Sequence, residues 1–194
     1  MVNTTLLEIT TRPFLRILSE KYSRPITKIS EIPESEFDEW KKMGFEWIWM
    51  MGIWQIGEYG LNHDRTRPNK IQKYNEICPD WKPEDVIGSP YAIVSYTINP
   101  ELGKEEDILW LRRQLNQRGM KLMLDFVPNH TAFDSIEITK DKKLEYFVHF
   151  PDNMDIKDAN LTEEKFDELY GPHKIAFGGS SGFKPWTDVA QLNY

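Results

Sequence analysis

The sequence predicts an α/β fold built on a parallel sheet. Two nearly continuous apolar runs, 45–53 and 121–127, are too short for typical helices and have the composition of strands covered on both faces. Each run follows a segment with the apolar spacing of an amphipathic helix, 33–44 and 104–119. Because strands that alternate with helices pair in parallel, this order predicts a parallel sheet.

The first strand of the sheet is predicted over 8–18, where β-branched and aromatic residues gather. Pro13 limits this strand to an early or edge position, because proline has no N–H to donate to a neighbouring strand. The helix over 33–44 is favoured by Pro33 at its first position and by Gly44 as its C-terminal stop.

The helix over 104–119 has the clearest pattern in the chain. Acidic residues 105–107 complement the positive end of its dipole, and Gly119 closes it. Three apolar residues repeat on one face, namely Ile108, Leu111 and Leu115. The buried strand over 121–127 follows at once.

Two other stretches lack a clear period. Residues 54–99 carry four prolines and are predicted to form a long irregular connection, a kind that is usually functional. Residues beyond His130 are polar and glycine-punctuated, with no further strand–helix unit. The sequence therefore predicts three adjacent parallel strands, at 9–18, 45–53 and 121–127. It also predicts a separate irregular lobe at 131–190.

Composition and charge exclude several classes of function. The 194 residues carry a net charge of −7 without a basic cluster, which argues against nucleic-acid binding because a phosphate-binding face must be basic. No run of about 18 apolar residues is present, so neither a transmembrane helix nor a membrane partner is expected. The single Cys78 cannot form an internal disulfide and no secretion signal is recognisable, so we expect a cytoplasmic protein.

"KLMLDFVPNH", residues 121–130, is the most informative stretch of the chain. Asp125 falls at the end of a predicted strand, and Asn129 and His130 follow just beyond Pro128. Since ligands bind beyond the carboxyl ends of strands in parallel β/α folds, these side chains indicate a site there. The alternative is a capping turn, because Asp, Pro and Asn are ordinary loop residues.

A second loop, within 88–103, is expected to reach the same face of the sheet. Tyr91 and Tyr96 are candidates for stacking against a sugar there, because the C–H faces of pyranose rings are apolar. The alternative is that both tyrosines pack locally. An aromatic content of 13% fits either a bulky core or a surface for flat ligand faces.

Other reaction chemistries lack their motifs. The four histidines show no i, i+4 pair and no cysteine partner, so a zinc site is not indicated. "GGSSG" is not preceded by a strand or followed by a Lys-Ser/Thr pair, so it is not a phosphate-binding loop. No Gly-X-Ser-X-Gly elbow is present.

"KLMLDFVPNH" resembles the first signature region of the α-amylase family of glycoside hydrolases, which ends the third strand of that family's barrel. The resemblance covers nearly the whole chain, in order. "FDEWKKMGFEWIWMMGIWQIG" is similar to the family's first helix and second strand. "GSPYAIVSYTINPELGKEEDILWLRRQLNQRGMKLMLDFVPNHT" is similar to the segment from its substrate-stacking loop through the third strand, and "PWTDVAQLNY" to the segment that leaves its inserted domain B.

The resemblance implies the first three strands of a (β/α)8 TIM barrel, with an irregular domain B inserted after strand 3. The implied domains are the N-terminal part of the barrel at 1–130, the insertion at 131–190 and the start of the return to the barrel at 191–194. The implied activity is that of a retaining enzyme acting on α-glucosidic bonds, by hydrolysis or by glucosyl transfer. Its partner would be an α-glucan, an oligosaccharide or an α-glucoside.

The resemblance also assigns roles to four residues. Tyr91 would stack beneath the sugar at the cleavage subsite, and His130 would hydrogen-bond that sugar. Asp125 would be a structural carboxylate under the site. Asn129 matches a position that is a calcium ligand in many relatives, so calcium is compatible with the site although no cofactor is required.

Two features depart from the family's pattern. Aspartates that are frequent in the substrate loop are replaced by Ala92 and Ser95. No segment before Tyr194 resembles the "GFRxD" pattern of the fourth strand, so no catalytic carboxylate is expected in these residues. The chain is then the N-terminal part of a family enzyme, a non-catalytic carbohydrate-binding or regulatory remnant, or a small β/α domain with an unrelated role. The last is disfavoured because three strands leave open sheet edges.

Overall fold

The computed structural model describes residues 4–139, 144–150, 174–179 and 186–194. The chain divides into two compact units. Unit 1 comprises Met1–Gln55 and Tyr96–Phe126, and unit 2 comprises Ile56–Ser95 and Val127–Tyr194. Within the described ranges, every helix is too short or too polar to span a membrane.

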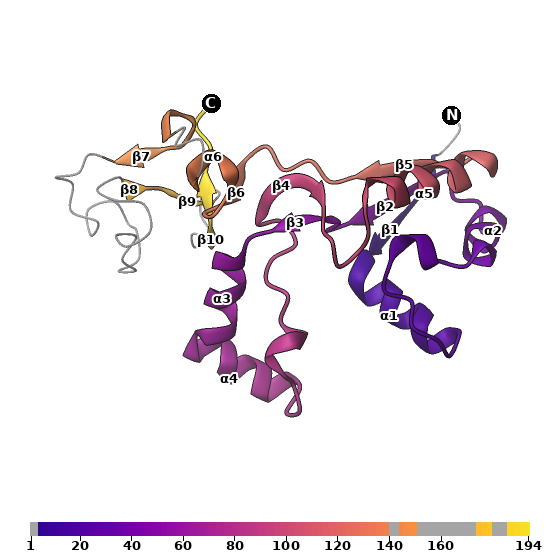
Figure 1. Cartoon of the computed structure of the whole chain (residues 1–194), viewed down its shortest axis with the longest axis horizontal. Helices are drawn as coiled ribbons and strands as arrows, with labels where there is room; N and C mark the ends of the chain where they lie inside the picture. The colour runs from indigo at the N-terminus through magenta and orange to yellow at the C-terminus, as the bar shows by residue number, and fades with distance from the viewer. Residues whose placement is uncertain (1–3, 140–143, 151–173, 180–185) are drawn as a thin grey trace. The chain divides into compact units, whose positions relative to one another are not determined.

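Unit 1 is built on a three-stranded parallel sheet (Figure 1). Its strands, in the order β1-β2-β5, are β1 (Leu6–Thr10), β2 (Trp47–Met51) and β5 (Lys121–Leu124). This arrangement confirms the predicted α/β class, the parallel sheet and the strands expected within 45–53 and 121–127. The sheet is open, and the described residues form no closed barrel.

The strand predicted over 8–18 is wrong for most of its length. Thr11–Lys21 forms helix α1, and β1 ends one residue before it. Leu15 and Leu18 are buried on one face of α1, so the helix places both leucines in the core at once. Pro13 lies in the first turn of α1, where its missing N–H removes no helical hydrogen bond.

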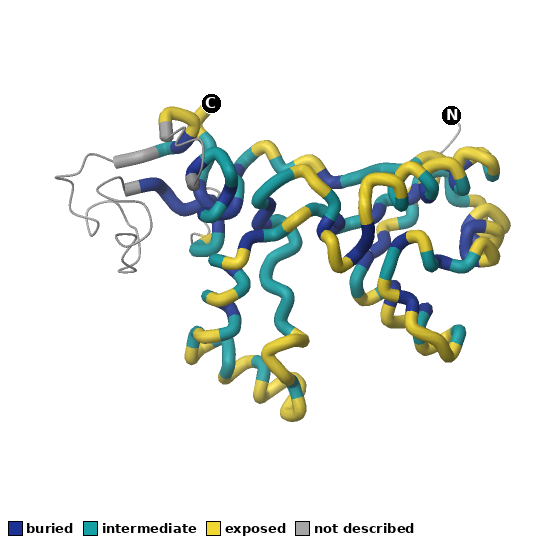
Figure 2. The backbone as a smooth tube through the Cα atoms, in the orientation of Figure 1, coloured by how far each residue is buried: buried dark blue, intermediate teal, exposed yellow. Residues whose placement is uncertain are grey.

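The two helices predicted in unit 1 are confirmed as α2 (Glu34–Lys42) and α5 (Glu105–Gln117). Gly44 (φ +87°) and Gly119 (φ +70°) follow their ends in the left-handed conformation that glycine adopts without strain. Figure 2 shows buried stretches on these helices and on β2. The core of unit 1 includes Phe37, Ile48, Met50, Leu111 and Leu115.

The irregular connection predicted over 54–99 is also wrong. It contains β3 (Trp54–Ile56), α3 (Glu58–Thr66), α4 (Pro68–Ile77), a 3-10 turn at Pro83–Asp85 and β4 (Ile93–Ile98). Pro68 stands at the first position of α4, where proline is favoured, so it begins a helix instead of breaking one. No residue of α4 is buried (Figure 2), which explains the missing hydrophobic period.

The segment after Val127 contains short strands where the sequence predicts none. The strands β6 (His130–Ala132), β9 (Phe177–Gly178) and β10 (Trp186–Gln191) form an antiparallel sheet in the order β6-β10-β9. A second pair joins β7 (His149–Phe150) to β8 (Lys174–Ile175), and α6 is a single turn at Ile136–Thr139. Several of these strands have only two or three residues, which leaves little alternation to read in the sequence.

Unit 2 has a main hydrophobic cluster of its own. Its buried residues are Phe133, Ile138, Phe147, Ile175, Phe177 and Ala190, with Tyr59 of α3 packed against them. Tyr59 meets Phe133 edge-on, with ring centroids 5.3 Å apart. This contact ties α3 to the residues that follow β6.

Candidate functional site

Asp125 lies in unit 1, directly after β5, and is buried. Its carboxylate accepts hydrogen bonds from the Trp49 indole N–H at 2.9 Å and from the Gly52 backbone N–H at 2.6 Å. Its backbone carbonyl accepts a third from the Trp54 indole at 2.9 Å. Asp125 therefore fastens the end of β5 to the turn after β2.

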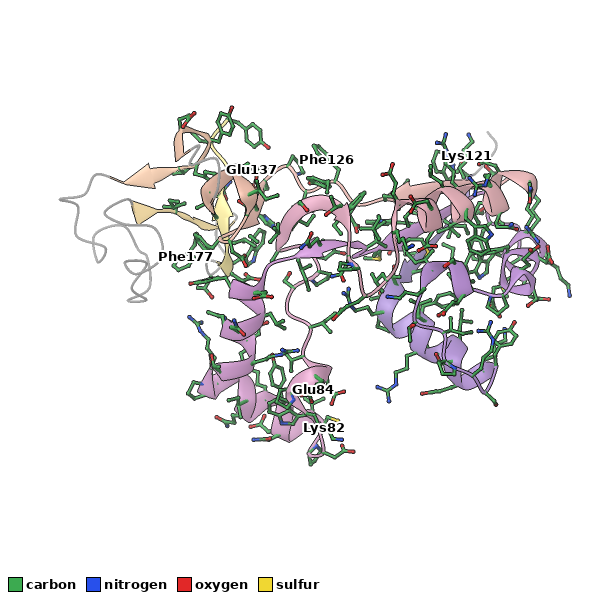
Figure 3. All side chains as sticks on the ribbon, in the orientation of Figure 1. Lys82, Glu84, Lys121, Phe126, Glu137 and Phe177 are labelled. Atoms are coloured by element: carbon green, nitrogen blue, oxygen red, sulfur yellow. The ribbon has the colours of Figure 1, made fainter. Side chains whose placement is uncertain are left out.

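Three aromatic rings contact one another near the end of β5, within unit 1. Tyr96 lies edge-on to Trp54 at 5.3 Å between centroids and 6.0 Å from Phe126. Phe126, labelled in Figure 3, is 76% exposed. Tyr96 thus packs locally, as the alternative interpretation has it, while 47% of it stays exposed.

His130 lies in unit 2 and is buried at the start of β6. Its Nδ1 lies 3.2 Å from the side-chain amide nitrogen of Asn129. Its ring also hydrogen-bonds the backbone of Tyr91, in a contact that favours the protonated ring, so the backbone group is the carbonyl oxygen. The structure therefore brings the backbone of Tyr91 and the side chain of Asn129 to the ring of His130.

Trp186 is a neighbour of His130 that is not among the residues predicted from the sequence. Its ring meets the imidazole edge-on, at 5.3 Å between centroids and 68° between planes, and it is 42% exposed. Asp188, two residues further along β10, acts electrostatically on His130. In the sequence, the tryptophan of "PWTDVAQLNY" is the one residue that could have indicated this neighbour. Its closeness to His130 becomes apparent only from the pairing of β10 with β6.

Burial lowers the pKa of His130 below its ordinary value of 6.5, although the Tyr91 carbonyl and the Asp188 carboxylate oppose this. We expect the contribution of His130 to the free energy of unfolding to be fully present above this ordinary pKa and to be lost as the pH falls below it. The reason is that the unfolded chain then binds a proton more readily than the folded imidazole does. His130→Gln should weaken this dependence. Urea unfolding at about pH 7.5 and about pH 5.5 measures it in the wild type and in His130→Gln. Equal pH dependence in the wild type and His130→Gln would contradict the expectation.

The surroundings of Asn129 bear on the calcium ion that the resemblance allows. Its side-chain oxygen accepts a hydrogen bond from the Gln191 amide at 3.2 Å, so this oxygen already has a protein donor. Within the described ranges, no group of three or more His, Cys, Asp or Glu side chains is placed to hold a metal ion. The described residues around Asn129 therefore do not by themselves fit a calcium ion, which prefers six to eight oxygen ligands with carboxylates among them.

Comparison with known proteins shows where this chain belongs. Residues 34–170 match the family model of the alpha-amylase catalytic domain. Alpha-amylase mde5 of Schizosaccharomyces pombe is 31% identical over 112 residues, which are 58% of this chain and 17% of that protein. The alpha-amylase of Lactobacillus plantarum has a similar fold, with a TM-score of 0.56 and 24% identity over 98% of this chain and 32% of its own.

A mutant of the trehalulose synthase MutB of Pseudomonas mesoacidophila MX-45, in complex with its substrate sucrose, gives a TM-score of 0.59. It is 16% identical over 98% of this chain and 30% of its own. The chain thus spans about a third of the length of these two solved structures and under a fifth of the curated relative. The structures show the shared fold, and the family model covers more than half of the chain. This chain belongs to the alpha-amylase family of glycoside hydrolases.

Proposed function

We propose that the chain supplies part of the sugar-binding site of an enzyme that acts on α-glucosidic bonds in carbohydrate metabolism. The enzyme is a hydrolase or a glucosyltransferase, and its partner is an α-glucan, an oligosaccharide or an α-glucoside. Membership of the alpha-amylase family supports the class of bond. MutB, a relative in fold, holds its substrate sucrose.

The grouping of His130, Trp186 and the backbone of Tyr91 is the observation that carries the proposal. Trp186 combines 42% exposure with an edge-on contact to a buried imidazole. An exposed indole offers an apolar face to a pyranose ring, and the imidazole and neighbouring backbone offer polar groups to its hydroxyls. The arrangement has the mixed apolar and polar character that sugar recognition requires.

In the proposed enzyme, Asp125 and the three predicted segments have structural roles. Asp125 supports the loop after β5, as its three hydrogen bonds favour. Residues 1–130 belong to the barrel, 131–190 to the insertion, and 191–194 begin the return to the barrel. The catalytic carboxylates of the enzyme would then lie outside the segments that match the family's first three strands.

Titration of the chain with maltose tests sugar binding directly. We expect resonances of His130 and Trp186 to shift in NMR spectra, and we expect Trp186→Ala to weaken binding about tenfold, a loss of about 1.4 kcal/mol. Trp81→Ala is the matched control, since Trp81 lies in the same unit and packs on Tyr74. Shifts absent from both residues, or equal weakening by both variants, would contradict the proposed site.

A further inference from the structure

Gln191, the last residue of β10, links the strand to the residue that precedes His130. Its side-chain nitrogen Nε2 lies 2.9 Å from the backbone oxygen of Asn129, 3.2 Å from Asn129 Oδ1 and 3.2 Å from the backbone oxygen of Leu192. Its oxygen Oε1 accepts from the Gly179 N–H at 3.2 Å. One amide group therefore joins β10 to the residues before β6 and after β9.

These contacts fix the orientation of the Gln191 amide. Three oxygens surround Nε2, and a backbone N–H points at Oε1. Exchanging the two atoms would set an oxygen against three oxygens and an NH2 group against an N–H donor. Only one orientation satisfies the hydrogen bonds.

The orientation of the Gln191 amide fixes that of the Asn129 amide, which in turn fixes the tautomer of His130. Because Asn129 Oδ1 accepts from Gln191, the Asn129 NH2 group is directed to His130 Nδ1 at 3.2 Å, with Gln191 Oε1 3.4 Å away. A nitrogen that receives a donor must be the acceptor of the neutral ring. The proton of His130 then lies on Nε2. The Tyr91 backbone, which the ring also hydrogen-bonds, offers a carbonyl that can accept such a proton.

We infer that Gln191 is a positioning residue that holds His130 as the neutral Nε2–H form, and that its amide does so in place of a metal ion. Asn129 stands at a position that the family resemblance gives to a calcium ligand, and its oxygens face an amide nitrogen here. The two hydrogens of an NH2 group can be donated to two of these oxygens at a time, without the charge of a cation and without further carboxylates.

This inference deepens the proposed function and rests on it only where the sugar is concerned. With Nδ1 occupied by Asn129, the imidazole can offer a ligand the Nε2–H donor alone. A sugar oxygen would accept that hydrogen bond. The relay of hydrogen bonds from Gln191 through Asn129 to His130 therefore favours a sugar atom that accepts a hydrogen bond at this point.

The ring-nitrogen chemical shifts of His130 in the 15N-histidine-labelled chain report the tautomer without any sugar. They are readable in solution or in sedimented protein, and His130→Gln assigns the signal. In the wild type we expect the Nε2–H form, unchanged by calcium or by a chelator. The Nδ1–H form, or a shift caused by calcium, would overturn the inference whether or not sugar binds.

Gln191→Glu tests the relay itself. The new carboxylate cannot donate to the three oxygens, so Asn129 loses its orientation and His130 should become a mixture of both tautomers. Gln72→Glu, the same change in the same unit, should leave the wild-type signal, since Gln72 contacts Glu76 on α4. Added calcium should restore the Nε2–H form in Gln191→Glu by bridging the carboxylate and the oxygens. An unchanged tautomer in folded Gln191→Glu contradicts the positioning role, and a mixture that calcium leaves unaltered contradicts the replacement of a metal.

Discussion

Replacing Asp125 by alanine is expected to lower the free energy of unfolding by about 2–4 kcal/mol, among the largest effects of any single substitution in the chain. The carboxylate is buried and accepts two N–H groups, from Trp49 and from the Gly52 backbone. Removing the acceptor leaves both donors without it in a region with little access to water. Each such loss costs about 1–3 kcal/mol, and the two are not fully additive.

Asp38→Ala is the matched control for this prediction. Asp38 lies on α2 of the same unit and pairs with Arg118 at 2.6 Å, but its side chain is 64% exposed. An exposed ion pair contributes less than about 1 kcal/mol. Urea unfolding followed by tryptophan fluorescence compares the two variants, and Asp125→Asn keeps only one of the two acceptor oxygens and should fall between them. Equal losses for Asp125→Ala and Asp38→Ala would show that the buried hydrogen bonds of Asp125 contribute no more than an exposed pair.

The sheet of unit 1 is largely predictable because two of its strands lie in short, nearly continuous apolar runs, although β2 alternates between buried and half-buried residues and β5 is only half-buried. β2 and β5 lie inside apolar runs, and α2 and α5 carry an amphipathic period with glycine stops. The boundary between β1 and α1 is not predictable in this way. The stretch 8–18 has strand-forming composition, yet Leu15 and Leu18 pack into the core as one helix face.

The candidate site shows a different limit. Asp125, Asn129 and His130 are adjacent to a strong strand signal, so local sequence directs attention to them. Trp186 and Gln191 reach the same place only through the pairing of β10 with β6, in which Gln191 lies opposite His130. Nothing in the local sequence around either residue specifies a partner so far away along the chain.

The 194-residue chain is expected to hydrolyse no α-glucoside. A retaining enzyme needs an acid to protonate the leaving oxygen and a carboxylate nucleophile, about 5–5.5 Å apart. The Asp125 carboxylate already accepts hydrogen bonds from two N–H groups, and Asp64 forms an ion pair with Lys70 at 3.0 Å. One oxygen of Asp134 accepts from the Tyr59 N–H and the other is buried, which leaves this half-buried carboxylate little access to a substrate. The carboxylates Asp152, Asp155 and Asp158 lie outside the described residues.

Release of glucose from maltose, from sucrose and of nitrophenol from a nitrophenyl α-glucoside measures this prediction. The comparison is a fusion of this chain to the remaining strands of the Lactobacillus plantarum alpha-amylase, whose fold it shares. Because that fusion restores the segments that resemble the fourth and later strands, it should turn over at least one substrate while the 194 residues turn over none. Turnover by the short chain, lost on substitution of Asp152, Asp155 or Asp158, would place the acid and the nucleophile in the segment after β6. An inactive fusion that folds and binds maltose would instead favour a carbohydrate-binding or regulatory role, because the sugar site would then be present without productive alignment of the catalytic carboxylates.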